Sequence, residues 1–138
     1  MNILQAEITI KPKKRGFHII TDEIINSLDI TNINIGTMNI FLKHTSASLC
    51  INENVEPEVR TDLENLYNEL CDDKSYYEHT YEGDDDMPAH AKASMIGVSL
   101  TIPITKGRLN LGTWQGIYLN EHREYASSRS IVITAIGN

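Results

Sequence analysis

The residues from Tyr77 to His90 carry side chains that bind metal ions and transfer protons. This segment holds two histidines and five carboxylates around one glycine. Imidazole nitrogens and carboxylate oxygens are protein ligands for divalent cations, and histidine also exchanges protons near neutral pH. Residues 72–86 contain seven acids and one lysine, which together give −6 of the formal net charge of −7. Either this is a solvated acidic loop, or its acids are held against something positive.

Asp86 and His90 are four residues apart, and Ser94 follows after four more. If this stretch is helical, the three side chains share one face of the helix. Asp86 then either orients the His90 ring or binds a metal ion together with it. The alternative is a helix-capping aspartate next to a surface histidine.

A second candidate site lies at His44, at the end of an apolar run. Small residues follow it from Thr45 to Ser48. They leave room for a ligand and offer hydrogen bonds, as the floor of a pocket does. The alternative is a hydrogen-bonded core histidine in a tight turn. Downstream, the polar segment Asn52–Asn54 either binds a ligand or caps the next helix.

The only tryptophan, Trp114, lies between Gly112 and Gly116 in a predicted strand. Glycine inside a strand often marks the close approach of a ligand or of another backbone. Trp114 therefore either stacks on a flat heterocycle or is a core or subunit-interface residue. Further on, Arg123 and Arg129 carry planar guanidinium groups that suit phosphate. An arginine paired with a surface glutamate is the common alternative.

Three helices are expected between these candidate sites. The first begins with Thr21 as its N-cap. The third begins near Met87–Pro88, is capped by Asp86 and ends at Gly97. The second starts at Pro57, which suits a first turn, and its apolar residues recur at helical spacing, namely Val59, Leu63, Leu66, Tyr67 and Leu70.

Alternating apolar residues predict strands over much of the rest of the chain. Strand content therefore dominates. The seven expected strands are Leu4–Ile10, Phe17–Ile20, two between Gly36 and Ile51 separated near His44–Ser46, Val98–Ile104, Leu109–Leu119 and Ser130–Ile136.

Size and composition narrow the class of protein. The 138 residues are 41% hydrophobic, which is enough for the core of one domain over residues 1–138. The acidic balance argues against nucleic-acid binding, which needs a basic surface. No apolar run is long enough to cross a membrane, and residues 1–7 lack a signal-peptide layout, so we expect a cytoplasmic location. Cys50 and Cys71 form no CxxC pair and need no disulfide.

In combination, these segments closely resemble the YjbQ family, whose members have long been of unknown function. The likeness covers nearly the whole chain. It rests on segments that occur in this order: Gly16–Phe17, Thr21–Ile24, His44–Ala47, Asn52–Asn54, Tyr77–His79, Asp86–His90, Lys92, Gly112–Gln115, and Glu121 with Arg129.

The resemblance implies a compact α+β domain, predominantly β, with a sandwich or barrel-like sheet and about three short helices, assembling as a homotrimer. It also implies a weak thiamine-phosphate synthase activity, in which a thiazole nitrogen displaces pyrophosphate from a pyrimidine methyl diphosphate. The family pattern includes the positions of His44, His79, His90 and Glu121. His122 lies where many relatives carry another residue.

A divalent cation would neutralise the departing diphosphate in such a reaction. The carboxylates of Asp84–Asp86 suit Mg²⁺, whereas three histidines favour Zn²⁺. We therefore expect His44, His79 and His90 as metal ligands and His90, Asp86 and Glu121 as catalytic residues. The expected contacts to a phosphorylated small molecule are Thr45, Ser46, Asn52, Asn54, Lys92, Trp114, Gln115 and Arg129.

Two other functions fit the same residues. One is a metal-dependent hydrolase of a phosphorylated small molecule, in which histidine and aspartate activate water. The other is a non-enzymatic protein that binds a metal ion or a small ligand. The chain has no glycine-rich phosphate loop and no recognisable pair of nucleophile and base.

Overall fold

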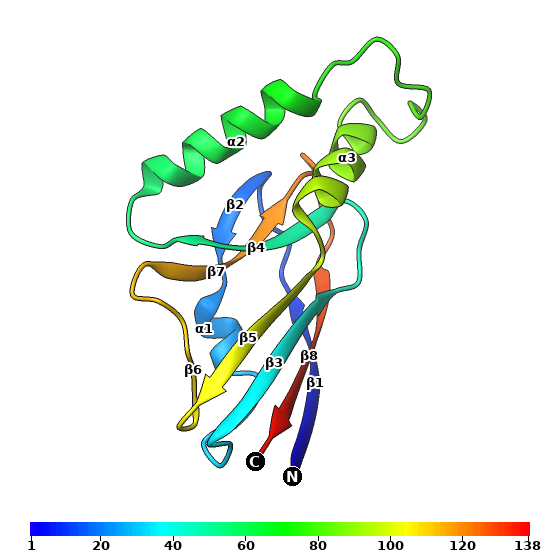
Figure 1. The fold of residues 1–138 in the computed structure, drawn as a ribbon. Helices are drawn as coiled ribbons and strands as arrows, with labels where there is room; N and C mark the ends of the chain where they lie inside the picture. The colour runs from blue at the N-terminus through cyan, green and yellow to red at the C-terminus, as the bar shows by residue number, and fades with distance from the viewer.

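The computed structural model describes residues 1–138, which form eight strands and three helices (Figure 1). The α+β class with dominant strands is confirmed, and the expected strand number was one too few. In chain order the elements are β1 (Asn2–Ile10), β2 (Gly16–Ile19), α1 (Thr21–Ile25), β3 (Ile35–Leu42), β4 (Ala47–Glu53), α2 (Pro57–Cys71), α3 (Asp86–Ile96), β5 (Ser99–Thr105), β6 (Arg108–Leu109), β7 (Gln115–Glu121) and β8 (Arg129–Gly137).

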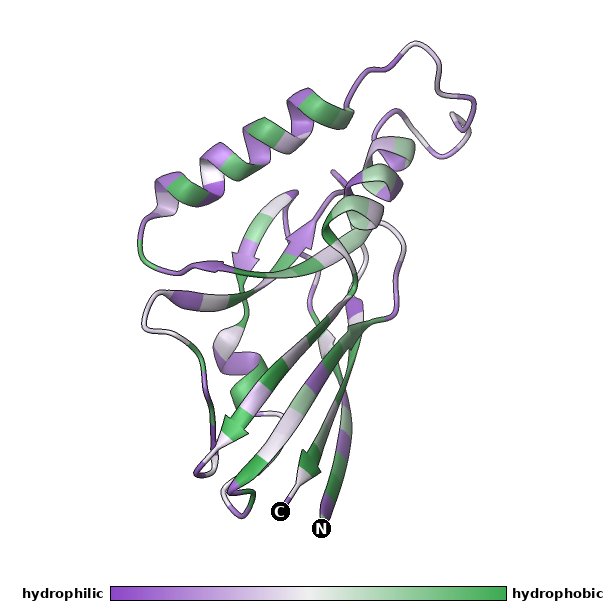
Figure 2. Cartoon of the chain, viewed as in Figure 1, coloured by the Kyte–Doolittle hydropathy of each residue, from purple (hydrophilic) through white to green (hydrophobic).

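Five strands form a curled antiparallel sheet in the order β1-β8-β3-β5-β6 (Figure 1). Its apolar residues alternate along each strand, so that one face of the sheet lines the core. Ile131 and Ile133 on β8 and Ile40 on β3 are each 0% exposed on this inner face. Figure 2 shows the alternation as bands of hydrophobic and hydrophilic residues along the strands.

The other three strands form a second antiparallel sheet in the order β2-β7-β4. Its central strand, β7, is buried along nearly its whole length, and Tyr118 and Leu119 are 0% exposed. Helices α2 and α3 pack against β2 and β4 respectively (Figure 1). The second sheet therefore lies between the core and the two helices, so both of its faces are covered.

The three expected helices are confirmed, but two of their N-caps were wrong. Ile20 occupies the N-cap of α1, because the Thr21 hydroxyl accepts a hydrogen bond from the Ile117 amide of β7 instead. Asp85 occupies the N-cap position of α3. Asp86 is the first helical residue, and its carboxylate binds other side chains. Gly97 ends α3 at φ 106°, as glycine allows.

The single strand expected over Leu109–Leu119 was wrong. β6 ends at Leu109, and β7 begins at Gln115 in the other sheet. The Gln115 side chain accepts a hydrogen bond from the Gly112 amide and closes a turn that contains Trp114. Leu111 packs against the core without being in a strand, so its apolar character gave a false strand signal. No helix is long and apolar enough to cross a membrane.

Candidate functional site

Asp86 is the centre of a group of three potential metal ligands. Its Oδ2 atom lies 2.7 Å from Nε2 of His79 and 3.0 Å from Nε2 of His90. One ligand atom from each residue lies within 4.8 Å of the other two. Of the predicted metal ligands, the structure brings His79 and His90 together, with Asp86 between them.

Two elements place these side chains. Asp86 and His90 lie one turn apart on α3 and share a face of that helix, as their spacing predicts. His79 comes from the segment that links α2 to α3. The two imidazole rings lie side by side, with centroids 5.5 Å apart, and both remain partly open to solvent. An ion could therefore reach the group from outside.

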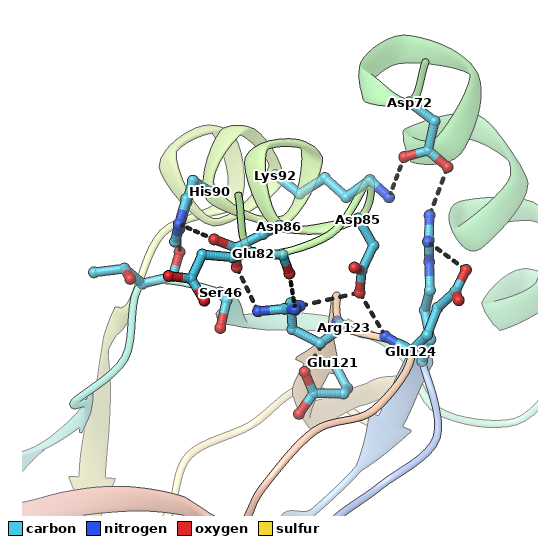
Figure 3. A network of polar contacts seen from close by, with 12 residues as sticks. Ser46, Asp72, Glu82, Asp85, Asp86, His90, Lys92, Glu121, Arg123 and Glu124 are labelled. Atoms are coloured by element: carbon cyan, nitrogen blue, oxygen red, sulfur yellow. Dashed lines mark hydrogen bonds and ion pairs between the residues drawn. The ribbon is translucent and has the colours of Figure 1, made fainter. Parts of the chain in front are cut away.

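Arg123 holds the acidic start of α3 in place (Figure 3). Its guanidinium donates hydrogen bonds to Asp86 Oδ1 at 2.5 Å and to Asp85 Oδ2 at 3.0 Å, and a third to the Glu82 carbonyl oxygen at 2.8 Å. Asp85 also accepts the amide hydrogen of Glu124. These acids are thus held against a positive charge, which was the second of the two alternatives. Because Arg123 occupies Oδ1, Asp86 presents only Oδ2 to the histidines.

The charges around Asp86 keep its carboxylate ionised. Burial alone would raise the pKa of Asp86, which is 5% exposed. The hydrogen bond from His79, the contact with His90 and the positive charge of Arg123 outweigh burial, so its pKa lies below the ordinary value. Burial and Arg123 oppose each other in the same way at Asp85, and its pKa is also lowered, with help from the Glu124 amide.

His90 lies between two hydrogen-bond acceptors. Its Nδ1 is 2.8 Å from the Thr45 carbonyl oxygen, and its Nε2 is 3.0 Å from the Asp86 carboxylate. A neutral imidazole has one N–H and can satisfy only one of them. Either the ring is doubly protonated, or a cation bridges Nε2 and the carboxylate. The second arrangement matches metal-binding histidines, whose other nitrogen typically donates to a carbonyl. The residues present therefore fit a divalent metal ion.

His44 lies outside this group of three. Its Nε2 accepts a hydrogen bond from the Ser130 amide at 2.8 Å, so that nitrogen has no free lone pair for a metal. His44 nevertheless shares a cavity of about 420 Å³ with His90. The remaining lining residues are Thr45, Ala93, Ser94, Gly97 and Val98. Of the three predicted histidines, His79 and His90 contact Asp86, and His44 lines a cavity together with His90.

Glu121 and Arg129 form a buried ion pair with each other. Arg129 donates to both carboxylate oxygens, at 2.7 and 2.5 Å, and to the Ser46 carbonyl oxygen at 3.3 Å. Glu121 is 0% exposed and Arg129 is 5% exposed. Glu121 also accepts the amide hydrogen of Arg123. The pair therefore supports the chain segment that carries Arg123, and neither charge is open to solvent.

Lys92 is 1% exposed and faces α2 (Figure 3). Its ammonium lies 2.8 Å from Asn68 Oδ1 and 2.9 Å from Asp72 Oδ1. The contact with Asp72 is an ion pair without hydrogen-bond geometry. Lys92 follows His90 by two residues, so it leaves α3 from a different face. In this arrangement Lys92 joins the two helices, and its ammonium is buried between them, away from any phosphate in solvent.

The remaining predicted contacts lie in two places. Thr45 and Ser46 stand beside His90 and Arg129, where they offer backbone carbonyls. Asn52, Asn54, Trp114 and Gln115 lie at the opposite end of β7, because Gln115 pairs with Glu53 and Glu121 pairs with Ala47. Glu121 lies six positions beyond Gln115 along the strand, which separates these ends by roughly 20 Å. Within one chain, Trp114 and the two asparagines are therefore not part of the His79–Asp86–His90 group.

The comparisons with known proteins agree on one family. The family profile described as UPF0047 protein YjbQ-like matches residues 6–138. The chain belongs to the YjbQ family. The UPF0047 protein YjbQ of Escherichia coli O157:H7 is 52% identical to this chain over 134 residues, which cover 96% of this chain and 97% of that protein. A UPF0047 protein of Synechocystis is 38% identical over 96% of this chain and 91% of its own length.

Solved structures of YjbQ-like proteins share the fold. A YbjQ-like protein of unknown function from Sulfolobus solfataricus superposes with a TM-score of 0.88, at 25% identity and over 99% of both chains. An uncharacterised YjbQ/UPF0047 protein from Clostridium acetobutylicum has a TM-score of 0.84 at 33% identity, over 95% of this chain and 99% of the other. These likenesses confirm the YjbQ-like α+β fold.

Nothing in the sequence indicated one buried hydrogen-bond network, formed by His122, Ser48 and Asn120. His122 is 1% exposed, and its Nε2 lies 2.8 Å from the Ser48 hydroxyl, which also accepts a hydrogen bond from the Asn120 side chain. Burial, with the charges of Lys92 and Arg15, lowers the pKa of His122 to about 3. His122 is therefore neutral, and its Nε2 shares a hydrogen bond with the Ser48 hydroxyl. Ser48 and Asn120 lie opposite each other on the face of the second sheet that the helices cover, where strand alternation alone would predict exposed side chains.

Proposed function

We propose that this chain binds a divalent metal ion through His79, Asp86 and His90, and that it acts on a phosphorylated small molecule. The observation that carries the proposal is the position of Asp86 Oδ2 between two imidazole nitrogens, with the second nitrogen of His90 bound to a carbonyl. Two nitrogens and one oxygen suit Zn²⁺, which uses such sets in catalytic sites. Mg²⁺ is disfavoured, because Arg123 engages Asp85 and one oxygen of Asp86.

The surroundings explain why a phosphorylated substrate would need the metal. No lysine or arginine lines the cavity beside His90, and Lys92 and Arg129 are buried in ion pairs. The bound ion would supply the positive charge that neutralises a departing phosphate or diphosphate. Arg123 would keep Asp86 turned towards the histidines, and Thr45 would keep the proton of His90 on Nδ1.

Within this class, we propose thiamine-phosphate synthesis as the reaction to test first, because the family resemblance implies it. A thiazole ring nitrogen would form a bond to the pyrimidine methylene carbon, and pyrophosphate would leave with the electrons of the broken C–O bond. The attacking nitrogen carries no proton, so this step needs charge neutralisation and no general base. A site with a metal group and no free basic side chain is compatible with that requirement.

We also propose assembly as a homotrimer. The resemblance implies it, and two uncovered surfaces favour association. Trp114 is 64% exposed at one end of the second sheet. The outer face of the five-stranded sheet exposes Ile3, Ile35 and Phe41 at 70%, 72% and 44%. Apolar side chains on an open sheet face are often covered in an oligomer.

The test is conversion of the two thiamine precursors by chelator-treated protein, with and without added Zn²⁺. We expect zinc-dependent formation of thiamine phosphate. His90→Ala should lose at least the roughly 10²-fold in rate that is typical of removing one catalytic group. The matched control is His18→Ala, at a histidine bound to the Lys14 carbonyl outside the group.

Equal rates for wild type and His90→Ala would contradict a catalytic role for the group. Phosphatase activity without synthase activity would favour the hydrolase, and zinc binding without either activity would favour a binding protein.

A further inference from the structure

The hydrogen bond from Ser130 fixes the tautomer of His44. The Ser130 amide can only donate, so Nε2 of His44 must accept, and it does so at 2.8 Å. A neutral imidazole with an unprotonated Nε2 carries its one hydrogen on Nδ1. The donor belongs to β8, next to the buried Arg129–Glu121 pair, so the ring is anchored to a strand of the five-stranded sheet. His44 therefore has a defined N–H whose direction is set by the sheet.

The charges near His44 favour its neutral form. Burial and the positive charge of Arg129 lower its pKa, against a smaller opposite effect of Glu121. His44 Nδ1 makes no hydrogen bond within the chain, although the ring is only half-buried. His44 is one of the residues that line the 420 Å³ cavity, as is His90. A hydrogen-bond donor with no partner thus lies in the wall of a cavity next to the proposed metal ligands.

We infer that His44 is a neutral hydrogen-bond donor for a ligand oxygen in this cavity, and that it is not a metal ligand. The inference rests on the proposed function, because the metal group at His90 forms the other side of the same cavity. A phosphoryl group bound at the metal would turn one oxygen towards His44 Nδ1. Since no lysine or arginine lines the cavity, the metal would supply the positive charge. The hydrogen bond from His44 would orient the phosphoryl group. His44 is in this sense a positioning residue for the substrate.

The first experiment measures the tautomer in the wild-type protein. Nitrogen-15 NMR of the imidazole rings at neutral pH should show His44 with Nδ1 protonated and Nε2 unprotonated. A doubly protonated ring, or one protonated on Nε2, would overturn the inference without any variant having to fold. This result is independent of whether His79, Asp86 and His90 bind a metal.

The second experiment separates the two binding steps by calorimetry. Zn²⁺ alone is titrated into metal-free protein, and phenylphosphonate is then titrated into the zinc-loaded protein. His44→Phe removes the donor. His44→Gln keeps it, because the amide oxygen can accept from Ser130 while the amide nitrogen donates. His79→Gln is the matched change at a proposed ligand.

We expect both His44 variants to bind Zn²⁺ like wild type, whereas His79→Gln binds it more weakly. His44→Phe should bind phenylphosphonate roughly 10-fold to 100-fold more weakly, the effect of one hydrogen bond to a charged group, and His44→Gln should retain most of the affinity. Loss of Zn²⁺ binding in folded His44→Gln, or unchanged phosphonate binding in His44→Phe, would overturn the inference. Unchanged Zn²⁺ binding in His79→Gln would instead overturn the proposed metal site.

Discussion

Burial of His122 in its neutral form should make the protein less stable in mild acid, where the unfolded chain takes up a proton at this residue. Its native pKa of about 3 lies below the ordinary value of 6.5, which applies to the unfolded chain. Between these two values the unfolded state binds the extra proton, so the free energy of unfolding falls as the pH is lowered through 6.5. Each pH unit well inside this window costs about 1.4 kcal/mol. From pH 7 to pH 5, His122 should therefore account for a loss of roughly 2 kcal/mol.

Urea denaturation at pH 7 and pH 5, followed by circular dichroism, measures this loss. His44 also has a lowered pKa and adds to the wild-type change with the same sign, so a variant is needed to isolate His122. His122→Gln cannot be protonated, and its amide oxygen can accept the Ser48 hydrogen. We expect the variant to lose roughly 2 kcal/mol less than wild type between the two pH values. Equal pH dependence of wild type and His122→Gln would refute the reasoning.

Three further predictions concern the metal group, the helices and the assembly. Arg123→Lys keeps the charge but cannot reach Asp85, Asp86 and the Glu82 carbonyl together. The dissociation constant for Zn²⁺, measured by calorimetry, should therefore rise roughly 10-fold to 100-fold. An unchanged constant would show that Arg123 does not orient Asp86. Asp72→Ala leaves buried Lys92 without its carboxylate and should lower the free energy of unfolding in urea by roughly 3 kcal/mol. Lys92→Met leaves Asp72 paired with Arg15 and should lower it by less. A larger loss for Lys92→Met than for Asp72→Ala would contradict this account of the Lys92–Asp72 pair. Static light scattering at micromolar concentration should give the mass of three chains, and a monomer or dimer would rule out the trimer.

Local sequence patterns predicted most of the elements but not all of their connections. The i, i+4 spacing of Asp86 and His90 correctly placed both side chains on one helical face. The apolar residues from Leu109 to Leu119 predicted one strand, yet the chain changes sheets at Gln115. Apolar character reports burial against the core and does not report which sheet a segment joins. The turn around Trp114 depends on a hydrogen bond between Gln115 and Gly112, which periodicity does not reveal.

The candidate site could be predicted only in part, because its partners are distant in sequence. Arg123 meets Asp86 across 37 residues, and the Ser130 amide meets His44 across 86. Arg129 and Lys92 are residue types that bind phosphate in open sites. Here they lie buried against Glu121 and Asp72, and sequence alone does not distinguish a free arginine from one paired in the core.

The central claim is that His79, Asp86 and His90 bind one divalent metal ion. The most direct test is a crystal structure of chelator-treated protein after addition of Zn²⁺, with anomalous scattering measured at the zinc absorption edge. We predict one strong anomalous peak between Nε2 of His79, Nε2 of His90 and Oδ2 of Asp86, with His44 Nε2 still bound to the Ser130 amide. No peak at this position, or a peak bound by His44 Nε2, would contradict the account.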